Sequence, residues 1–204
     1  MKVLGIFAHP DDEIIFGWPL MQDSEHDRYL LIVSDNHNTY GDGPWKALQE
    51  LCKNEQITLL DSPDLPNEFY RLPTRYDNFV LTDAIGKIQD SIARAIEDVN
   101  PRYVATHNMI GEYGHGDHRL LFDIVSRHEA VENLVISDMC QYVDCHFSHT
   151  EIPTRLKKRA FGNYLSKETL DMDWLNRNKA IYKKHNAWSW GGHEIITSCA
   201  MHSF

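Results

Sequence analysis

The chain lacks the cysteine patterns of small disulfide-rich proteins and of zinc fingers. It has four cysteines in 204 residues, and no two of them form a C-x-x-C pair. A chain of this length can bury a full-sized core without disulfides. We therefore expect free thiols in a reducing compartment.

Long apolar runs and an excess of positive charge are also absent. No stretch approaches the roughly 18 consecutive apolar residues of a membrane-spanning helix. The short apolar run at the N-terminus is followed at once by charged residues, so it predicts a strand rather than a secretory signal. We expect a cytoplasmic protein with no membrane insertion. The formal net charge of −10 argues against general binding to nucleic acid or to anionic membranes.

Short apolar runs alternate with amphipathic stretches, which indicates βαβ units and a mainly parallel sheet. No internal repeat, low-complexity tract or linker interrupts the pattern. Residues 1–204 are therefore expected to form one α/β domain with a Rossmann-like, three-layer fold. The pattern predicts strands over 3–8, 29–33, 57–60, 103–106 and 134–136, and helices over 45–54, 82–99, 118–128 and 167–184, the last with Ser166 as N-cap.

A group of ligand-type side chains follows the first predicted strand. His9-Pro10-Asp11-Asp12-Glu13 places one imidazole and three carboxylates directly after the apolar run. Pro10 disfavours helical backbone at His9, so the strand is expected to end there and the chain to turn. Active sites of open α/β sheets form at such carboxyl ends of strands. Because this much like charge needs a cation beside it, we interpret the loop as a metal site.

A second group, from Glu112 to His118, follows the strand predicted at 103–106. It contains His115, Asp117 and His118, and it repeats the order of strand, ligand-rich loop and helix. Two such loops of one parallel sheet meet above its carboxyl edge, which predicts a shared metal centre. Zinc takes imidazole and carboxylate ligands, and a catalytic zinc keeps one position open for water.

Together, Ala8-His9-Pro10-Asp11-Asp12-Glu13 and His115-Gly116-Asp117-His118 resemble the motifs of the PIG-L/LmbE family of zinc-dependent N-acetylglucosaminyl deacetylases. The order of the motifs, their strand contexts and their separation in the chain all agree with the family. The resemblance implies one Zn²⁺ per chain, held by His9, Asp12 and His118. It also implies that Asp11 is the general base, and that His115 stabilises the oxyanion and helps to protonate the leaving amine.

Two further carboxylates of these loops, Glu13 and Asp117, are interpreted as groups that orient the histidines. Solvated carboxylates at helix starts are the alternative for both. The chain departs from the family directly after Glu13, where Ile14-Ile15-Phe16-Gly17-Trp18-Pro19 replaces the usual small, glycine-rich continuation. These bulky residues leave the predicted chemistry intact and the substrate open.

Candidates for substrate binding lie in three other segments. Asn36 and His37 follow the second predicted strand, where polar side chains suit sugar hydroxyls and a simple turn is the alternative. Arg71 and Arg75 stand among aromatic residues in a proline-rich loop, which either binds a sugar or its phosphate or packs onto the domain. The aromatic tail segment 185–193 either caps the pocket or belongs to the core.

These observations predict a zinc-dependent hydrolase that removes an N-acyl group, most simply acetyl, from an amino sugar or sugar conjugate. That small molecule is the expected partner, and the oligomeric state is not predicted. One alternative is an amidase that acts on a non-sugar N-acyl amine. Another is a metal-dependent carbohydrate-binding module without catalysis, although a binding module needs no general base such as Asp11.

Overall fold

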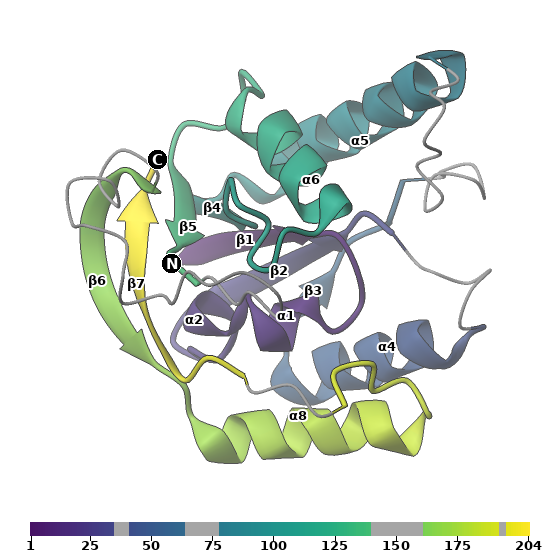
Figure 1. Cartoon of the computed structure of the whole chain (residues 1–204), viewed down its shortest axis with the longest axis vertical. Coiled ribbons are helices and arrows are strands. Elements are labelled where there is room, and N and C mark those ends of the chain that lie inside the picture. Colours follow the sequence, from purple (N-terminus) through teal and green to yellow (C-terminus); the bar gives the residue numbers. More distant parts are fainter. Residues whose placement is uncertain (35–40, 64–77, 140–160, 192–194) are drawn as a thin grey trace.

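The computed structural model describes residues 1–34, 41–63, 78–139, 161–191 and 195–204, and its strands form one mixed sheet (Figure 1). The strands lie in the order β3-β2-β1-β4-β5-β7-β6. The first five run parallel, whereas β7 pairs antiparallel with both β5 and β6. In chain order the strands are β1 (Lys2–Phe7), β2 (Asp27–Ile32), β3 (Thr58–Leu59), β4 (Tyr103–Thr106), β5 (Leu134–Ser137), β6 (Asn163–Thr169) and β7 (Ser198–Ser203).

Helices cover both faces of the sheet, which confirms the predicted α/β fold with a mainly parallel sheet (Figure 1). On one face, α5 and α6 enclose a buried cluster that includes Leu4 and Ile6 of β1. On the other face, α4, α8 and the short α1 and α2 enclose a second cluster, which includes Val3 and Phe7. Alternate residues of β1 thus enter different clusters, as expected for a strand buried on both sides. The described helices are α1 (Asp12–Ile15), α2 (Trp18–Met21), α4 (Gly43–Glu55), α5 (Asn78–Val99), α6 (Gly116–Ser126) and α8 (Met172–Lys184).

The C-terminal part differs from the prediction. The helix predicted over 167–184 is wrong in its first turn, because that stretch begins within β6 and α8 starts only at Met172. Asp171, rather than Ser166, caps α8, and its side chain accepts hydrogen bonds from two amides of the first turn. The prediction also lacked β7, with which β6 pairs along its length. This non-local pairing outweighs the local helical preference of the β6 residues.

The register of the two central strands brings the ligand-rich loops together. β1 lies between β2 and β4, and Ile6 of β1 pairs with Thr106 of β4. The Thr106 hydroxyl also donates a 2.7 Å hydrogen bond to the Ile6 carbonyl, which fixes the two strand ends side by side. Connections from β1 and β4 therefore start at the point where the strand order reverses, the usual place for a ligand site. Within the described ranges, no helix is long and apolar enough to cross a membrane.

Candidate metal centre and active site

The loop after β1 is a tight turn in which carboxylates accept hydrogen bonds from backbone amides. Asp12 Oδ2 accepts from the His9 N–H at 2.8 Å, and Glu13 Oε2 accepts from the Asp11 N–H at 3.0 Å. Asp11 has a φ of 95°, a left-handed conformation that is costly for a residue other than glycine and is found at functional turns. The carboxylates of Asp11, Asp12 and Glu13 are all buried. The turn thus holds three acidic groups inside the protein.

The loop after β4 is organised around the buried carboxylate of Glu112. Its Oε2 lies 3.1 Å from His107 Nδ1 and 2.8 Å from His118 Nδ1, and its Oε1 accepts from the Asn108 N–H at 3.0 Å. Burial alone would raise the pKa of Glu112, but the electrostatic attraction and the hydrogen bonds of His107 and His118 outweigh it and lower the pKa to about 2. Glu112 is therefore ionised, and both histidines donate to it through Nδ1.

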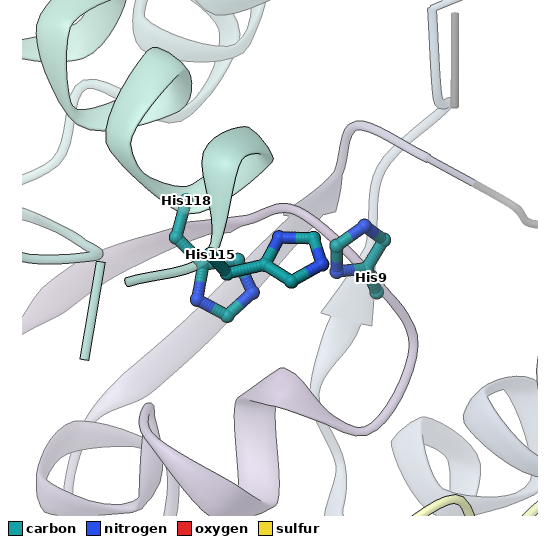
Figure 2. Close-up of side chains that lie close together, drawn as sticks. All are labelled: His9, His115 and His118. Atoms are coloured by element: carbon teal, nitrogen blue, oxygen red, sulfur yellow. The ribbon is translucent and has the colours of Figure 1, made fainter. Parts of the chain in front are cut away.

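The two loops meet at one oxygen, Asp12 Oδ2. It lies 3.3 Å from His9 Nδ1, 3.4 Å from His118 Nε2 and 3.3 Å from His107 Nε2. Two overlapping groups have potential ligand atoms within 4.8 Å of one another: Asp12 with His107 and His118, and His9 with His115 and His118. In Figure 2 the His9 ring, on the loop after β1, faces the rings of His115 and His118 at the start of α6.

Asp12 Oδ2 lies at the separation of two zinc ligands from one nitrogen of His9 and from one nitrogen of His118. His118 Nε2 is buried and has no hydrogen-bond partner among the described residues. Zinc–nitrogen bonds of about 2.0–2.1 Å put two ligands of a tetrahedron roughly 3.3–3.4 Å apart. The distances from Asp12 Oδ2 to His9 Nδ1 and to His118 Nε2 agree with this separation. Burial would raise the pKa of Asp12, but His118 and His107 hold it well below its usual range, so the carboxylate is ionised and could serve as an anionic ligand.

His107 is less available as a metal ligand than His9 and His118. Its Nε2 lies 3.0 Å from the Ala8 amide nitrogen, which donates to it. Burial lowers the pKa of His107 while Glu112 and Asp12 raise it to about 9, yet the Ala8 amide requires an unprotonated nitrogen. Because the strand backbone fixes the direction of that amide, we describe the ring as a neutral acceptor. A ring nitrogen has one lone pair, which the amide already occupies.

Asp117 has the contact expected of a group that orients a histidine. Its Oδ2 lies 3.0 Å from His9 Nε2, which leaves His9 Nδ1 directed at Asp12. A carboxylate on the far nitrogen of a histidine fixes the ring and its tautomer in many metal sites. Burial lowers the pKa of His9, but Asp117 and Asp12 outweigh it and raise the pKa to about 9. The surroundings of His9 therefore attract positive charge, whether a proton or a metal ion.

Glu13 has different partners from those expected. Its Oε1 accepts a 2.7 Å hydrogen bond from the Tyr182 hydroxyl on α8, and its Oε2 holds the Asp11 amide. The carboxylate thus holds the turn and α8, rather than a histidine, because the first turn of α1 directs it toward α8. Burial is the main cause that raises the pKa of Glu13 to about 7.

Asp11 is held by a residue that follows α8. The Ser189 hydroxyl donates to Asp11 Oδ2 at 2.5 Å. Burial, and then the negative charge of Asp12, raise the pKa of the Asp11 carboxyl well above its usual range. A raised pKa and a fixed direction are properties of a carboxylate that accepts a proton during a reaction.

His115 stands at the N-cap position of α6, half-buried between the other histidines. Its ring centroid lies 5.0 Å from that of His9 and 4.6 Å from that of His118. Burial and the charges of His118 and His9 lower the pKa of His115 to about 4, so the ring is neutral at pH 7. A neutral imidazole donates one N–H, which suits an oxygen on which negative charge develops.

Three aromatic rings from distant segments pack together beside the histidines. The Tyr113 centroid lies 5.9 Å from that of Phe16 and 5.3 Å from that of Trp190, and both Phe16 and Tyr113 contact the His118 ring. Tyr113 and Trp190 are half-buried. Of the two interpretations of the aromatic tail, Trp190 agrees with a position at the site, while Trp188 packs against α8.

Four predicted substrate-binding residues, Asn36, His37, Arg71 and Arg75, lie outside the described residues. The structure therefore does not test these four substrate-binding predictions.

Four described residues of the site had no role in the prediction: His107, Glu112, Tyr182 and Ser189. Sequence signals existed for two of them, since His107 is the first residue after the predicted strand 103–106 and Glu112 opens the second ligand-rich group. Tyr182 and Ser189 have no local signal, because only the fold brings them to the turn after β1.

Comparison with known proteins identifies the family and the fold. A family model described as PIG-L, GlcNAc-PI de-N-acetylase, matches residues 4–129, which include both loops. The chain belongs to the PIG-L family. The resemblance predicted from the two motifs is therefore confirmed. Among curated proteins, the uncharacterized protein L374 of Acanthamoeba polyphaga mimivirus is 26% identical over 137 residues, which make up 59% of this chain and 56% of that protein.

Solved structures of deacetylases share the fold at low sequence identity. The deacetylase–teicoplanin complex of the teicoplanin biosynthesis pathway has a TM-score of 0.65 at 13% identity and covers 100% of this chain and 99% of its own. The zinc-inhibited form of teicoplanin deacetylase Orf2 has a TM-score of 0.61 at 12% identity with the same coverage. The A40926 pseudoaglycone deacetylase Dbv21 has a TM-score of 0.60 at 14% identity and covers 98% of this chain and 95% of its own. At these identities the likeness concerns the fold.

Proposed function

We propose that this protein is a zinc-dependent hydrolase that removes an N-acyl group, most simply acetyl, from an amino sugar or sugar conjugate. The observation that carries the proposal is the convergence of His9, Asp12 and His118 beside the carboxylate of Asp11. Membership of the PIG-L family supports the same reaction. The similar solved structures are named as deacetylases, which agrees with it.

His9, Asp12 and His118 would hold the ion, and Asp11 would move the proton. A zinc ion at this place supplies a Lewis acid that polarises the acyl oxygen and lowers the pKa of water. The Asp11 carboxylate accepts a proton from the attacking water, and the Ser189 hydroxyl keeps the carboxylate oriented. The proton that Asp11 accepts would then pass to the leaving nitrogen.

His115 would act on the acyl group from the other side. In its neutral form it donates an N–H to the acyl oxygen as negative charge develops there. Its position at the start of α6, beside His118, places it next to the proposed ligands. We also assign it help in the protonation of the leaving amine: it would hold the acyl oxygen while the proton that Asp11 took from water passes to the nitrogen.

A sugar as substrate is supported by the rings of Tyr113 and Trp190. These rings are half-buried next to the centre, and aromatic faces pack well against the apolar faces of sugar rings. The names of the similar structures, which include a complex with teicoplanin, favour a conjugate over a free sugar. An amidase for non-sugar N-acyl amines and a carbohydrate-binding module without catalysis remain the alternatives.

The test is the release of acyl acid from a matched panel of substrates. Zinc-loaded protein and protein stripped with a chelator are each given N-acetylated amino-sugar conjugates and acyclic N-acetyl amines of similar size, and acetate is measured. We expect acetate from the sugar conjugates with zinc-loaded protein only. Release from the acyclic amines alone would identify the amidase. Binding of the sugar without release of any acid would identify the binding module and contradict the proposal.

A further inference from the structure

Glu112 has an unusual position for a carboxylate that no catalytic step uses. It is 1% exposed, and one of its oxygens, Oε2, bonds to two histidines at once, His118 at 2.8 Å and His107 at 3.1 Å. The other oxygen, Oε1, accepts the Asn108 N–H, so the carboxylate lies among three nitrogens and serves as an acceptor. Both Nδ1 atoms must therefore carry the hydrogen of their bond to Glu112.

This hydrogen-bond pattern decides which nitrogen of each ring is free. When Nδ1 carries the hydrogen, the lone pair of a neutral imidazole is on Nε2. The Nε2 lone pair of His118 faces Asp12 Oδ2 at 3.4 Å, and the proposed ion would lie between these two atoms. The Nε2 lone pair of His107 accepts the Ala8 amide at 3.0 Å. By holding both Nδ1–H groups, one carboxylate thus leaves Nε2 of His118 free for a metal and Nε2 of His107 free to accept from the Ala8 amide.

The two rings also support each other mechanically. The His107 and His118 centroids are 3.7 Å apart, and their planes differ by 13°, so one ring lies flat on the other. The His107 ring is in turn fixed at both nitrogens, by Glu112 and by the Ala8 amide. The plane of the His118 ring is therefore set by a neighbour that cannot easily turn.

Glu112 is itself held from β5 through Asn108. The Asn108 side chain donates to the carbonyls of Ser137 and Met139 and accepts from the Glu112 N–H at 3.3 Å. The Asn108 backbone N–H donates to Glu112 Oε1. Glu112 also has a left-handed φ of 53°, a conformation that persists only where surrounding bonds hold it. A continuous set of hydrogen bonds thus runs from the end of β5 to His118.

We propose that Glu112 is a positioning residue that fixes the tautomer and the ring plane of His118 for zinc, and that His107 is a strut between β4 and β1 rather than a ligand. The inference rests on the zinc site of the proposed function but not on its substrate or reaction. It assigns a role to Glu112 and separates two histidines that are equally close to Asp12.

The first experiment measures zinc affinity in Glu112→Gln by competition with a chromogenic chelator. Loss of such an outer carboxylate costs about 10- to 100-fold in metal affinity, and we expect a loss in that range. Glu55→Gln is the matched control, because Glu55 also bonds two side chains, Trp174 and Asn178, but away from the centre. The control should lose thermal stability and keep the wild-type zinc affinity. If Glu112→Gln does not fold, Glu112→Asp takes its place, with a loss of at least about tenfold expected.

The second experiment compares His107→Gln with His118→Ala. A glutamine oxygen can accept the Ala8 amide, so His107→Gln should lose less than about tenfold in zinc affinity, whereas the loss of a ligand costs far more. Cobalt substitution adds a spectroscopic readout. The visible spectrum of cobalt-loaded His107→Gln should match that of the cobalt-loaded wild type, because the ligands of the ion are unchanged. A loss of zinc as large as in His118→Ala would show that His107 is a ligand.

These outcomes are separate from those of the substrate panel. A Glu112 variant that binds zinc within twofold of wild type would overturn this inference and leave the deacetylase reaction standing. A wild-type protein that binds zinc but releases no acid from any substrate would refute the reaction and leave the role of Glu112 standing.

Discussion

The loops after β1 and after β4 supply the same centre, but they are supported in opposite ways. The carboxylates of the β1 loop are held by residues far away in the chain: Tyr182 bonds to Glu13 across 169 positions, and Ser189 bonds to Asp11 across 178. In the β4 loop, the histidines that bond to Glu112 lie only 5 and 6 positions from it. One loop depends on the C-terminal part of the fold, and the other largely supports itself.

Under the proposed function, Asp11 and His118 therefore have separate supports, while the proposed ligands His9 and Asp12 share the β1 loop with Asp11. Changes at the C-terminal supports should disturb Asp11 and therefore turnover, while zinc stays bound. Changes in the β4 loop should disturb His118 and therefore zinc. The family model matches residues 4–129, which include both loops but neither Tyr182 nor Ser189. The support of Asp11 is thus a feature of this chain beyond the matched region.

The largest effect is expected for His118→Ala, which removes a proposed ligand from the β4 loop. Zinc affinity should fall at least about a thousandfold, and acetate release should fall with it, because structural and catalytic zinc depends on each of its few ligands. Chelator competition and metal analysis measure the first quantity. His128→Ala is the control, since His128 bonds to the Gln89 carbonyl away from the centre. Wild-type zinc affinity in His118→Ala would contradict the ligand assignment.

Tyr182→Phe tests the remote support of the β1 loop. It deletes a buried hydrogen bond to the Glu13 carboxylate, which should reduce the free energy of unfolding by about 1–3 kcal/mol. We expect kcat to fall about tenfold, since small misplacements of a base are costly, while zinc affinity stays near that of wild type. Thermal unfolding, kinetics and chelator competition measure the three quantities. Tyr164→Phe, on the exposed β6, is the control. If zinc affinity falls and kcat does not, the two supports are not separate.

A smaller effect is expected for Ser189→Ala. Asp11 loses one hydrogen bond but keeps its backbone conformation, so kcat should fall roughly three- to tenfold, as for a typical hydrogen bond worth about 1 kcal/mol. KM and zinc affinity should not change. Ser126→Ala removes a surface serine hydroxyl bond and serves as the control. A rise in KM at constant kcat would instead make Ser189 a substrate contact.

The sequence predicted most of the parallel core and the two ligand-rich loops. Apolar runs such as 3–8 and 103–106 are visible because strands buried on both faces contain few polar residues. The turn at His9 was visible because Pro10 and crowded carboxylates follow a strand directly. The antiparallel strands β6 and β7 were not visible, because β6 is largely exposed and its structure depends on a partner far along the chain.

The candidate metal centre, like the fold, was predictable from the sequence only in part. The motifs pointed to the residues that meet at Asp12, since both loops leave neighbouring strands at one edge. The support of these residues was not predictable from local pattern. Glu112 is one carboxylate among many in the sequence, and only its burial against two histidines marks it. Tyr182 lies on the buried face of α8 as any core residue would, and only the fold reveals its bond to Glu13.

In the proposed function, His9, Asp12 and His118 hold the metal, and Asp11 moves the proton. Asp11→Asn tests it most directly, with zinc content and acetate release measured on the same preparation. We expect one zinc per chain, as in wild type, and a fall in turnover of about 10²- to 10⁴-fold, the usual contribution of a general base. Full turnover in the variant, or loss of its zinc, would contradict the account.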